Sequence, residues 1–167
     1  MPLKHIKKIR NNFHSFKDVR LFICIFFWAT LLPFIIKFLP LPEAMQIFAP
    51  SKTQRNIKNK HSAQEKIVRY TDYILNLNVW IWRTTCLKRS LLLYRFLNKI
   101  GIKAQVCFGV KFNNNTISKD KSNNLDGHAW LLLNGEIFLE RNIEMTKEFK
   151  MTYCFPISRP QVEHGRC

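Results

Sequence analysis

The chain has 167 residues, of which 47% are hydrophobic and 13% aromatic, and its formal net charge is +16. This composition excludes a wholly disordered protein, and the five glycines exclude a glycine-rich low-complexity class. Residues 1–60 carry +9, residues 61–100 carry +5 and residues 101–167 carry +2. The positive charge is interpreted in one of two ways. It flanks a segment that contacts the membrane, or it forms a surface on which partners dock. Nucleic acid is not expected to bind, because no known motif for it is present.

Residues 1–60 are predicted to be a basic, hydrophobic helical region followed by a linker. An apolar run, LFICIFFWATLLPFII, fills residues 21–36 and ends at Lys37. A signal peptide is rejected because no small-residue cleavage site follows the run. The run is slightly shorter than the roughly 17 residues that a membrane span needs. Two interpretations therefore stay open: a short or in-plane membrane helix, and a helix buried against the rest of the protein.

Two amphipathic helices are expected in the middle of the chain. Ser62 and Glu65 have the spacing of a capping box, ahead of an apolar face formed by Ile67, Tyr70, Ile74 and Leu77.

The second helix begins at or near Cys86, capped by Thr84 or Thr85, and is expected to end at Gly101. Its cysteine lies in the first turn, where free backbone N–H groups and the helix dipole favour a thiolate.

A small antiparallel sheet is expected to follow. Residues 102–112 alternate as a strand with one buried face, and residues 113–124 form a polar loop interpreted as an exposed insertion. The pair Asn134-Gly135 predicts a hairpin. A two-residue turn places Arg141 opposite His128, whereas a three-residue turn places Glu140 there, and periodicity does not choose between them.

The five cysteines are scattered, with no metal-ligand spacing. Neither a disulfide framework nor a metal site is expected, and single cysteines fit a reducing compartment. Cys24, Cys107 and Cys154 are interpreted as structural residues.

Residues 82–90 (WRTTCLKRS) and residues 127–130 (GHAW) form two motifs. They resemble the W-x-x-x-C-L-x-R-[AS] signature and the A-H-A-W motif of the transglutaminase-like leader peptidases of lasso-peptide (microcin-type) biosynthesis, in their stand-alone form. The resemblance covers residues 20–142. It implies an α+β fold: a small transglutaminase/papain-like core, in which a cysteine helix packs on an antiparallel sheet carrying histidine and acid, preceded by a hydrophobic helical segment. The expected division is residues 1–60, a catalytic core at 61–150 and a C-terminal tail at 151–167.

The resemblance also implies the site residues. Cys86 is the expected nucleophile, His128 the general base and acid, and Glu140 the group that orients His128. The family has an aspartate twelve residues after its histidine, where this chain has Glu140. Asp126 and Glu136 are weaker candidates for that role.

The implied function is leader removal from a lasso-peptide precursor by a cysteine peptidase. The expected partners are the precursor's leader peptide, a separate leader-recognition protein, a macrolactam cyclase, and a membrane surface or an exporter. No cofactor is expected in this chain, and any ATP dependence belongs to the cyclase. The expected location is cytoplasmic, with membrane association through residues 21–39. The alternatives are a catalytically silent membrane-associated scaffold and a transglutaminase-like hydrolase or transamidase with another substrate.

Overall fold

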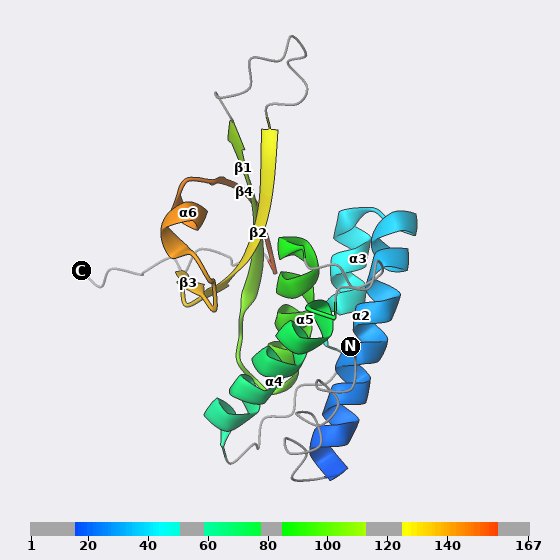
Figure 1. Ribbon diagram of the computed structural model, residues 1–167. Helices are drawn as coiled ribbons and strands as arrows, with labels where there is room; N and C mark the ends of the chain where they lie inside the picture. The colour runs from blue at the N-terminus through cyan, green and yellow to red at the C-terminus, as the bar shows by residue number, and fades with distance from the viewer. Residues whose placement is uncertain (1–15, 51–58, 78–84, 113–124, 157–167) are drawn as a thin grey trace, which may run out of the picture. The chain divides into compact units, whose positions relative to one another are not determined.

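The computed structural model describes residues 16–50, 59–77, 85–112 and 125–156, which form helices and an antiparallel sheet, as predicted for an α+β chain (Figure 1). The chain divides into two compact units, residues 1–102 and residues 103–167. The described helices of the first unit include the cysteine helix, and the second unit contains the sheet. The predicted catalytic core at residues 61–150 therefore draws on both units.

Four helices make up the described part of the first unit. They are α2 (Phe16–Phe38), α3 (Leu41–Phe48), α4 (Lys60–Leu75) and α5 (Cys86–Lys99). Helix α2 contacts each of the other three, and its inner side is buried at Ile25, Ala29, Leu32 and Ile35. Among the described helices, α2 is long and apolar enough to cross a membrane, a property that core helices and signal sequences share.

Helix α4 begins earlier than its capping box predicted. Asn59 is the N-cap, and its side-chain oxygen accepts a hydrogen bond from the backbone N–H of Ser62 at 3.0 Å. The helix ends at Leu75, so Leu77 lies beyond it and is 37% exposed. The predicted apolar face is confirmed at its first three positions, which are buried: Ile67, Tyr70 and Ile74.

Two arginines of α5 join it to its neighbours. Arg89 forms an ion pair with Asp72 of α4, with Nε 2.7 Å from Oδ1. The Arg95 guanidinium lies over the Trp28 ring of α2, 3.5 Å from the ring centroid, and donates a hydrogen bond to the carbonyl oxygen of Ile47. Desolvation by burial lowers the pKa of Arg95. These contacts fix α5 within the helical unit.

The second unit is built on a four-stranded antiparallel sheet. Its strands are β1 (Gln105–Phe112), β2 (Leu125–Leu133), β3 (Glu136–Phe138) and β4 (Lys150–Phe155), in the order β3-β2-β1-β4. A short helix, α6 (Ile143–Lys147), lies between β3 and β4 in sequence. The predicted loop at residues 113–124 lies outside the described residues.

The hairpin between β2 and β3 has the two-residue turn. Leu133 pairs with Glu136, and Asn134 and Gly135 both have positive φ angles, of 54° and 87°, as a type I′ turn requires. The pairing ends at Phe138, and Leu139 has a φ of 56°. Glu140 therefore follows a left-handed residue and does not continue the ladder, so neither predicted register describes its position.

Three other expectations differ from the structure. The tail does not begin at residue 151, because residues 150–155 form strand β4. Cys107 and Cys154 form a disulfide, so the interpretation of these two residues as scattered single cysteines is wrong. The two residues are 47 positions apart and meet because β1 and β4 pair at these positions. Cys107 is fully buried, so β1 is also covered on the side predicted to be exposed.

Candidate active site

Cys86 is the first residue of helix α5. Thr85 caps the helix, and its side-chain oxygen accepts a hydrogen bond from the backbone N–H of Lys88 at 3.3 Å. The predicted start of this helix is confirmed, as is its left-handed end at Gly101, where φ is 83°. Cys86 is a free, partly exposed thiol, and burial lowers the pKa of Lys88 in the same turn. The free N–H groups of a first turn favour an anion at this position.

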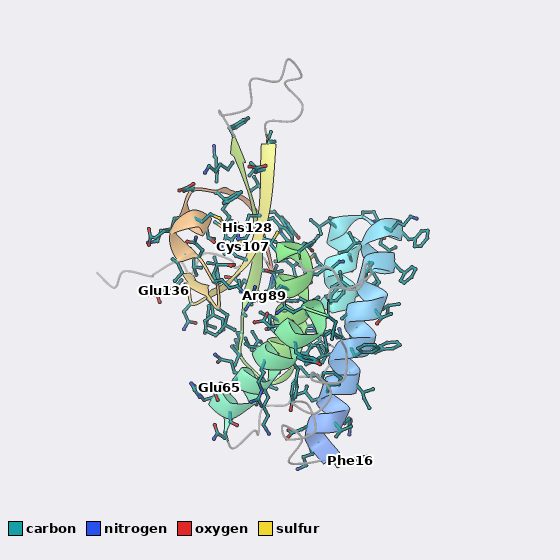
Figure 2. All side chains as sticks on the ribbon, in the orientation of Figure 1. Phe16, Glu65, Arg89, Cys107, His128 and Glu136 are labelled. Carbon is teal, nitrogen blue, oxygen red and sulfur yellow. A yellow bond between two sulfur atoms is a disulfide. The ribbon has the colours of Figure 1, made fainter. Side chains whose placement is uncertain are left out.

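His128 lies on β2 (Figure 2) and contacts two aromatic side chains. Its ring stacks on that of Trp130, with centroids 5.9 Å apart, and lies 5.1 Å from the ring of Phe149. Trp130 is 4% exposed and belongs to the core. Trp82, the other tryptophan of the motifs, lies outside the described residues.

Gly109 of β1 makes room for this aromatic stack. It lies directly opposite His128 in the β1–β2 register. A Cβ atom at residue 109 would lie 2.7 Å from Cη2 of Trp130 and 2.8 Å from the carbonyl oxygen of Lys150. Because both separations are shorter than carbon contacts allow, the tryptophan packs here only against glycine.

Glu140 is the acid that the structure brings to His128. Its Oε2 lies 3.6 Å from Nε2 of His128, and the two side chains are 13% and 10% exposed. The other carboxylate oxygen, Oε1, accepts a hydrogen bond from the backbone N–H of Arg141 at 3.0 Å. Asp126 and Glu136, the weaker candidates for this role, are both exposed. The carboxylate of Glu140 is therefore the acidic group that lies beside the His128 ring.

Thr146 of α6 is a site residue that the sequence did not indicate. Its Oγ1 lies 3.3 Å from Nε2 of His128, and the residue is 1% exposed. Asn142 caps α6 through its side chain, a local signal that predicts a short helix. The meeting of that helix with β2 depends on the tertiary fold, so no spacing in the sequence could have predicted it.

The structure joins His128, Glu140 and Thr146 in the second unit, whereas Cys86 belongs to the first unit. Arg89, the arginine of the cysteine motif, is held in its ion pair with Asp72, so its observed contact is structural. Within the described ranges, no group of three or more metal-ligating side chains is present.

Comparison with known proteins gives the class of the chain. Residues 31–154 match the family model described as the transglutaminase-like superfamily. The match covers more than half of the chain, so the protein belongs to that superfamily. No curated protein and no solved structure matches. Members of the superfamily are in general cysteine hydrolases or transamidases, and membership indicates chemistry of that kind here.

Proposed function

We propose that this protein is a cysteine peptidase that removes the leader from a lasso-peptide precursor. The observation that carries the proposal is the approach of Glu140 Oε2 to Nε2 of His128, at 3.6 Å, in a transglutaminase-like chain. A carboxylate beside Nε2 stabilises the imidazolium and leaves Nδ1 for the thiol. The cysteine in the first turn of α5 supplies the nucleophile.

The proposed reaction needs Cys86 Sγ and His128 Nδ1 to meet, although the two residues belong to different units. His128 takes the thiol proton, and the thiolate attacks the peptide carbonyl at the junction of leader and core. Backbone N–H groups at the start of α5 donate to the developing oxyanion. The tetrahedral intermediate collapses, His128 protonates the leaving amine, and a thioester remains. His128 then takes a proton from water, the hydroxide attacks the thioester, and the thiolate leaves.

The proposed partners follow from the same assignment. The leader peptide is the substrate, and a separate leader-recognition protein presents it. A macrolactam cyclase uses the freed core peptide, and an exporter is a further candidate partner. The chemistry of Cys86, His128 and Glu140 needs no cofactor from this chain, and any ATP dependence belongs to the cyclase.

The proposal includes a cytoplasmic location with membrane contact through residues 21–39, because precursor peptides are made there. Disulfides are rare in the cytosol. A cytoplasmic location therefore predicts that the Cys107–Cys154 bond, which is formed in the structure, is reduced in growing cells. Alkylating the thiols before lysis, followed by mass spectrometry under non-reducing conditions, measures this. A disulfide that is fully formed in the trapped sample would contradict the cytoplasmic location.

The direct test is mass spectrometry of a cognate precursor incubated with the protein and its leader-recognition partner. We expect the wild type to release the intact leader and the free core. Cys86→Ala should abolish release, whereas the matched variant Cys24→Ala, at the other free cysteine described, should retain it. Circular dichroism checks that both variants are folded.

The outcomes separate the proposal from its competitors. Release by Cys86→Ala at the wild-type rate would overturn the peptidase assignment. If the protein is required for processing but Cys86→Ala is fully functional, it is a silent scaffold. If an added amine is incorporated into the product and no free acid forms, it is a transamidase.

A further inference from the structure

The outer side of α2 carries a continuous stripe of large apolar side chains. Successive members are seven or four residues apart, so they lie on one side of the helix, and Figure 2 labels Phe16 at one end of it. The stripe consists of Phe16, Ile23, Phe27, Phe34 and Phe38, which are exposed by 85%, 59%, 59%, 50% and 73%. The buried side of α2 faces the opposite way.

Charged side chains of α4 and α5 contact the inner side of α2. In this arrangement α2 therefore does not cross the bilayer. Lys66 of α4 forms an ion pair with Asp18 at 2.7 Å. The Arg95 guanidinium lies against Trp28, near the middle of α2. A transbilayer α2 would carry these groups and the polar sides of α4 and α5 into hydrocarbon, at a high cost in free energy. An in-plane position, with the stripe toward the lipid, avoids this cost.

A cavity of about 350 Å³ opens beside the first turns of α2. Among the residues that the structure describes, its lining includes three cationic side chains, Lys17, Arg20 and Lys99, and no acidic side chain. The apolar part of the lining includes Ile67, Phe96 and Ile100, which are 1%, 2% and 8% exposed. Arg20 lies between Phe16 and Ile23 in sequence and so borders the stripe. The cavity therefore combines a cationic lining with an apolar floor next to an apolar surface.

We propose that this cavity binds the phosphate headgroup of an anionic phospholipid, while the stripe on α2 contacts the acyl chains. The cations match the phosphodiester charge, and the adjacent apolar surface matches the lipid tail. This site is separate from Cys86, His128 and Glu140 and does not depend on the proposed peptidase activity.

The test is flotation of the full chain with vesicles of phosphatidylcholine, with and without phosphatidylglycerol. We expect binding only with the anionic lipid. Because each cation near such a surface contributes about 1 kcal/mol, the double variant Arg20→Ala/Lys99→Ala should bind about tenfold or more weakly. The control Lys60→Ala/Lys103→Ala removes the same charge at exposed positions outside the cavity lining and should lose much less.

Three results would overturn the proposal. Equal losses in the two double variants would mean diffuse attraction without a site. If inorganic phosphate saturates the cavity at the same concentration as short-chain phosphatidylglycerol, the cavity is a general anion site that does not recognise lipid. Unchanged vesicle binding by Phe27→Ser/Phe34→Ser would remove the stripe from the interaction. Binding of phosphate and of short-chain phosphatidylglycerol is measured from the nuclear magnetic resonance shift of the Lys99 backbone amide during each titration.

A second inference concerns the Thr146 hydroxyl group. Its Oγ1 lies 2.9 Å from the carbonyl oxygen of Asn142, and a proton must lie between two oxygens this close. The carbonyl has no proton, so the hydroxyl donates its own. Toward His128 Nε2, at 3.3 Å, the hydroxyl then acts as an acceptor. The geometry points to a positioning role for Thr146: it holds His128 as the tautomer protonated on Nε2, with the lone pair on Nδ1.

The test of this second inference is nitrogen-15 nuclear magnetic resonance of the His128 ring at a pH where the ring is neutral. We expect the wild type and Thr146→Ser to carry the proton on Nε2, and the isosteric Thr146→Val to shift toward the Nδ1–H form. An unchanged tautomer in Thr146→Val would overturn the inference.

The kinetic consequence rests on the proposed function. Thr146→Val should lower kcat about tenfold or more with little change in KM, because a wrongly placed proton hinders base catalysis, and Thr146→Ser should restore kcat. If Thr146→Val shifts the His128 tautomer but the wild type cleaves no precursor, the peptidase proposal is refuted and the positioning role of Thr146 stands.

Discussion

The His128–Glu140 pair acts through charge. The 3.6 Å between Nε2 and Oε2 is longer than a hydrogen bond. Both side chains are largely buried, so water screens the carboxylate weakly. The shorter contact of Nε2 is with Thr146, at 3.3 Å. In the proposed mechanism, Thr146 fixes the position of the ring proton and Glu140 stabilises the positive charge that develops during turnover.

Replacement of Glu140 by Gln should preserve the fold and remove that charge. We expect kcat for precursor cleavage to fall by about 10⁴-fold, the size of the loss when the acid of such a triad is replaced, with KM nearly unchanged. Initial rates followed by mass spectrometry give both constants. Glu136→Gln, which removes an exposed carboxylate from β3, is the control. Equal rates for the two variants would mean that Glu140 has no catalytic role.

Tyr94 of α5 should make stability fall at high pH. Burial raises its pKa, and its unfolded value is about 10. Its contribution is therefore complete below about pH 10 and is lost as the pH rises through the higher folded value. Tyr94→Phe should give a shallower fall in the unfolding free energy above about pH 10, measured by denaturant titration. An identical slope in both proteins would contradict this expectation.

At the scale of helices and strands, local signals predicted much and tertiary contacts decided the rest. The start of α5 at Cys86 and the turn at Asn134-Gly135 depend on a few neighbouring residues, and both are confirmed. Strand β4 was missed because its residues do not alternate clearly and are ordered by pairing with β1. The approach of Glu140 to His128 was predicted from the motif spacing. The turn at Leu139 that produces it gave no sequence signal.

The junction of β1, β2 and β4 at Gly109 should not tolerate a larger side chain. Gly109→Ala places a methyl group against the Trp130 ring and the Lys150 carbonyl oxygen. We expect a loss of about 1–3 kcal/mol in unfolding free energy from overpacking, together with slower turnover because Trp130 supports His128. Denaturant titration and cleavage rates measure these effects. Gly127→Ala, where an added Cβ has nothing within 4 Å, is the control, and equal losses in both would contradict the steric argument.

At the scale of the whole molecule, the proposed catalytic residues are divided between two compact units. Cys86 belongs to the helical unit, whereas His128 and Glu140 belong to the sheet unit. The Cys107–Cys154 disulfide joins β1 to β4 inside the second unit. The proposed activity therefore needs both units to be folded. Among the residues described, only the sheet unit contains this crosslink.

Reduction of the disulfide should weaken the sheet unit more than the helical unit. We expect the unfolding free energy to fall by about 2–4 kcal/mol, the typical contribution of a disulfide. Hydrogen exchange should accelerate in β1 and β4 more than in α5. Denaturant titration and exchange mass spectrometry, with and without reductant, measure both. The double variant Cys107→Ala/Cys154→Ala should not respond to reductant, and an equal response there would assign the effect to another group.

The left-handed backbone at Leu139 has a consequence for how this position can evolve. A non-glycine residue with a φ of 56° is held at a cost of about 1–2 kcal/mol. Glycine would relieve that cost, but it would also release the chain that aims the next carboxylate. Under the proposed mechanism, selection for stability and selection for turnover therefore act in opposite directions on residue 139. A library ranked by melting temperature alone would enrich glycine there and discard the better catalysts.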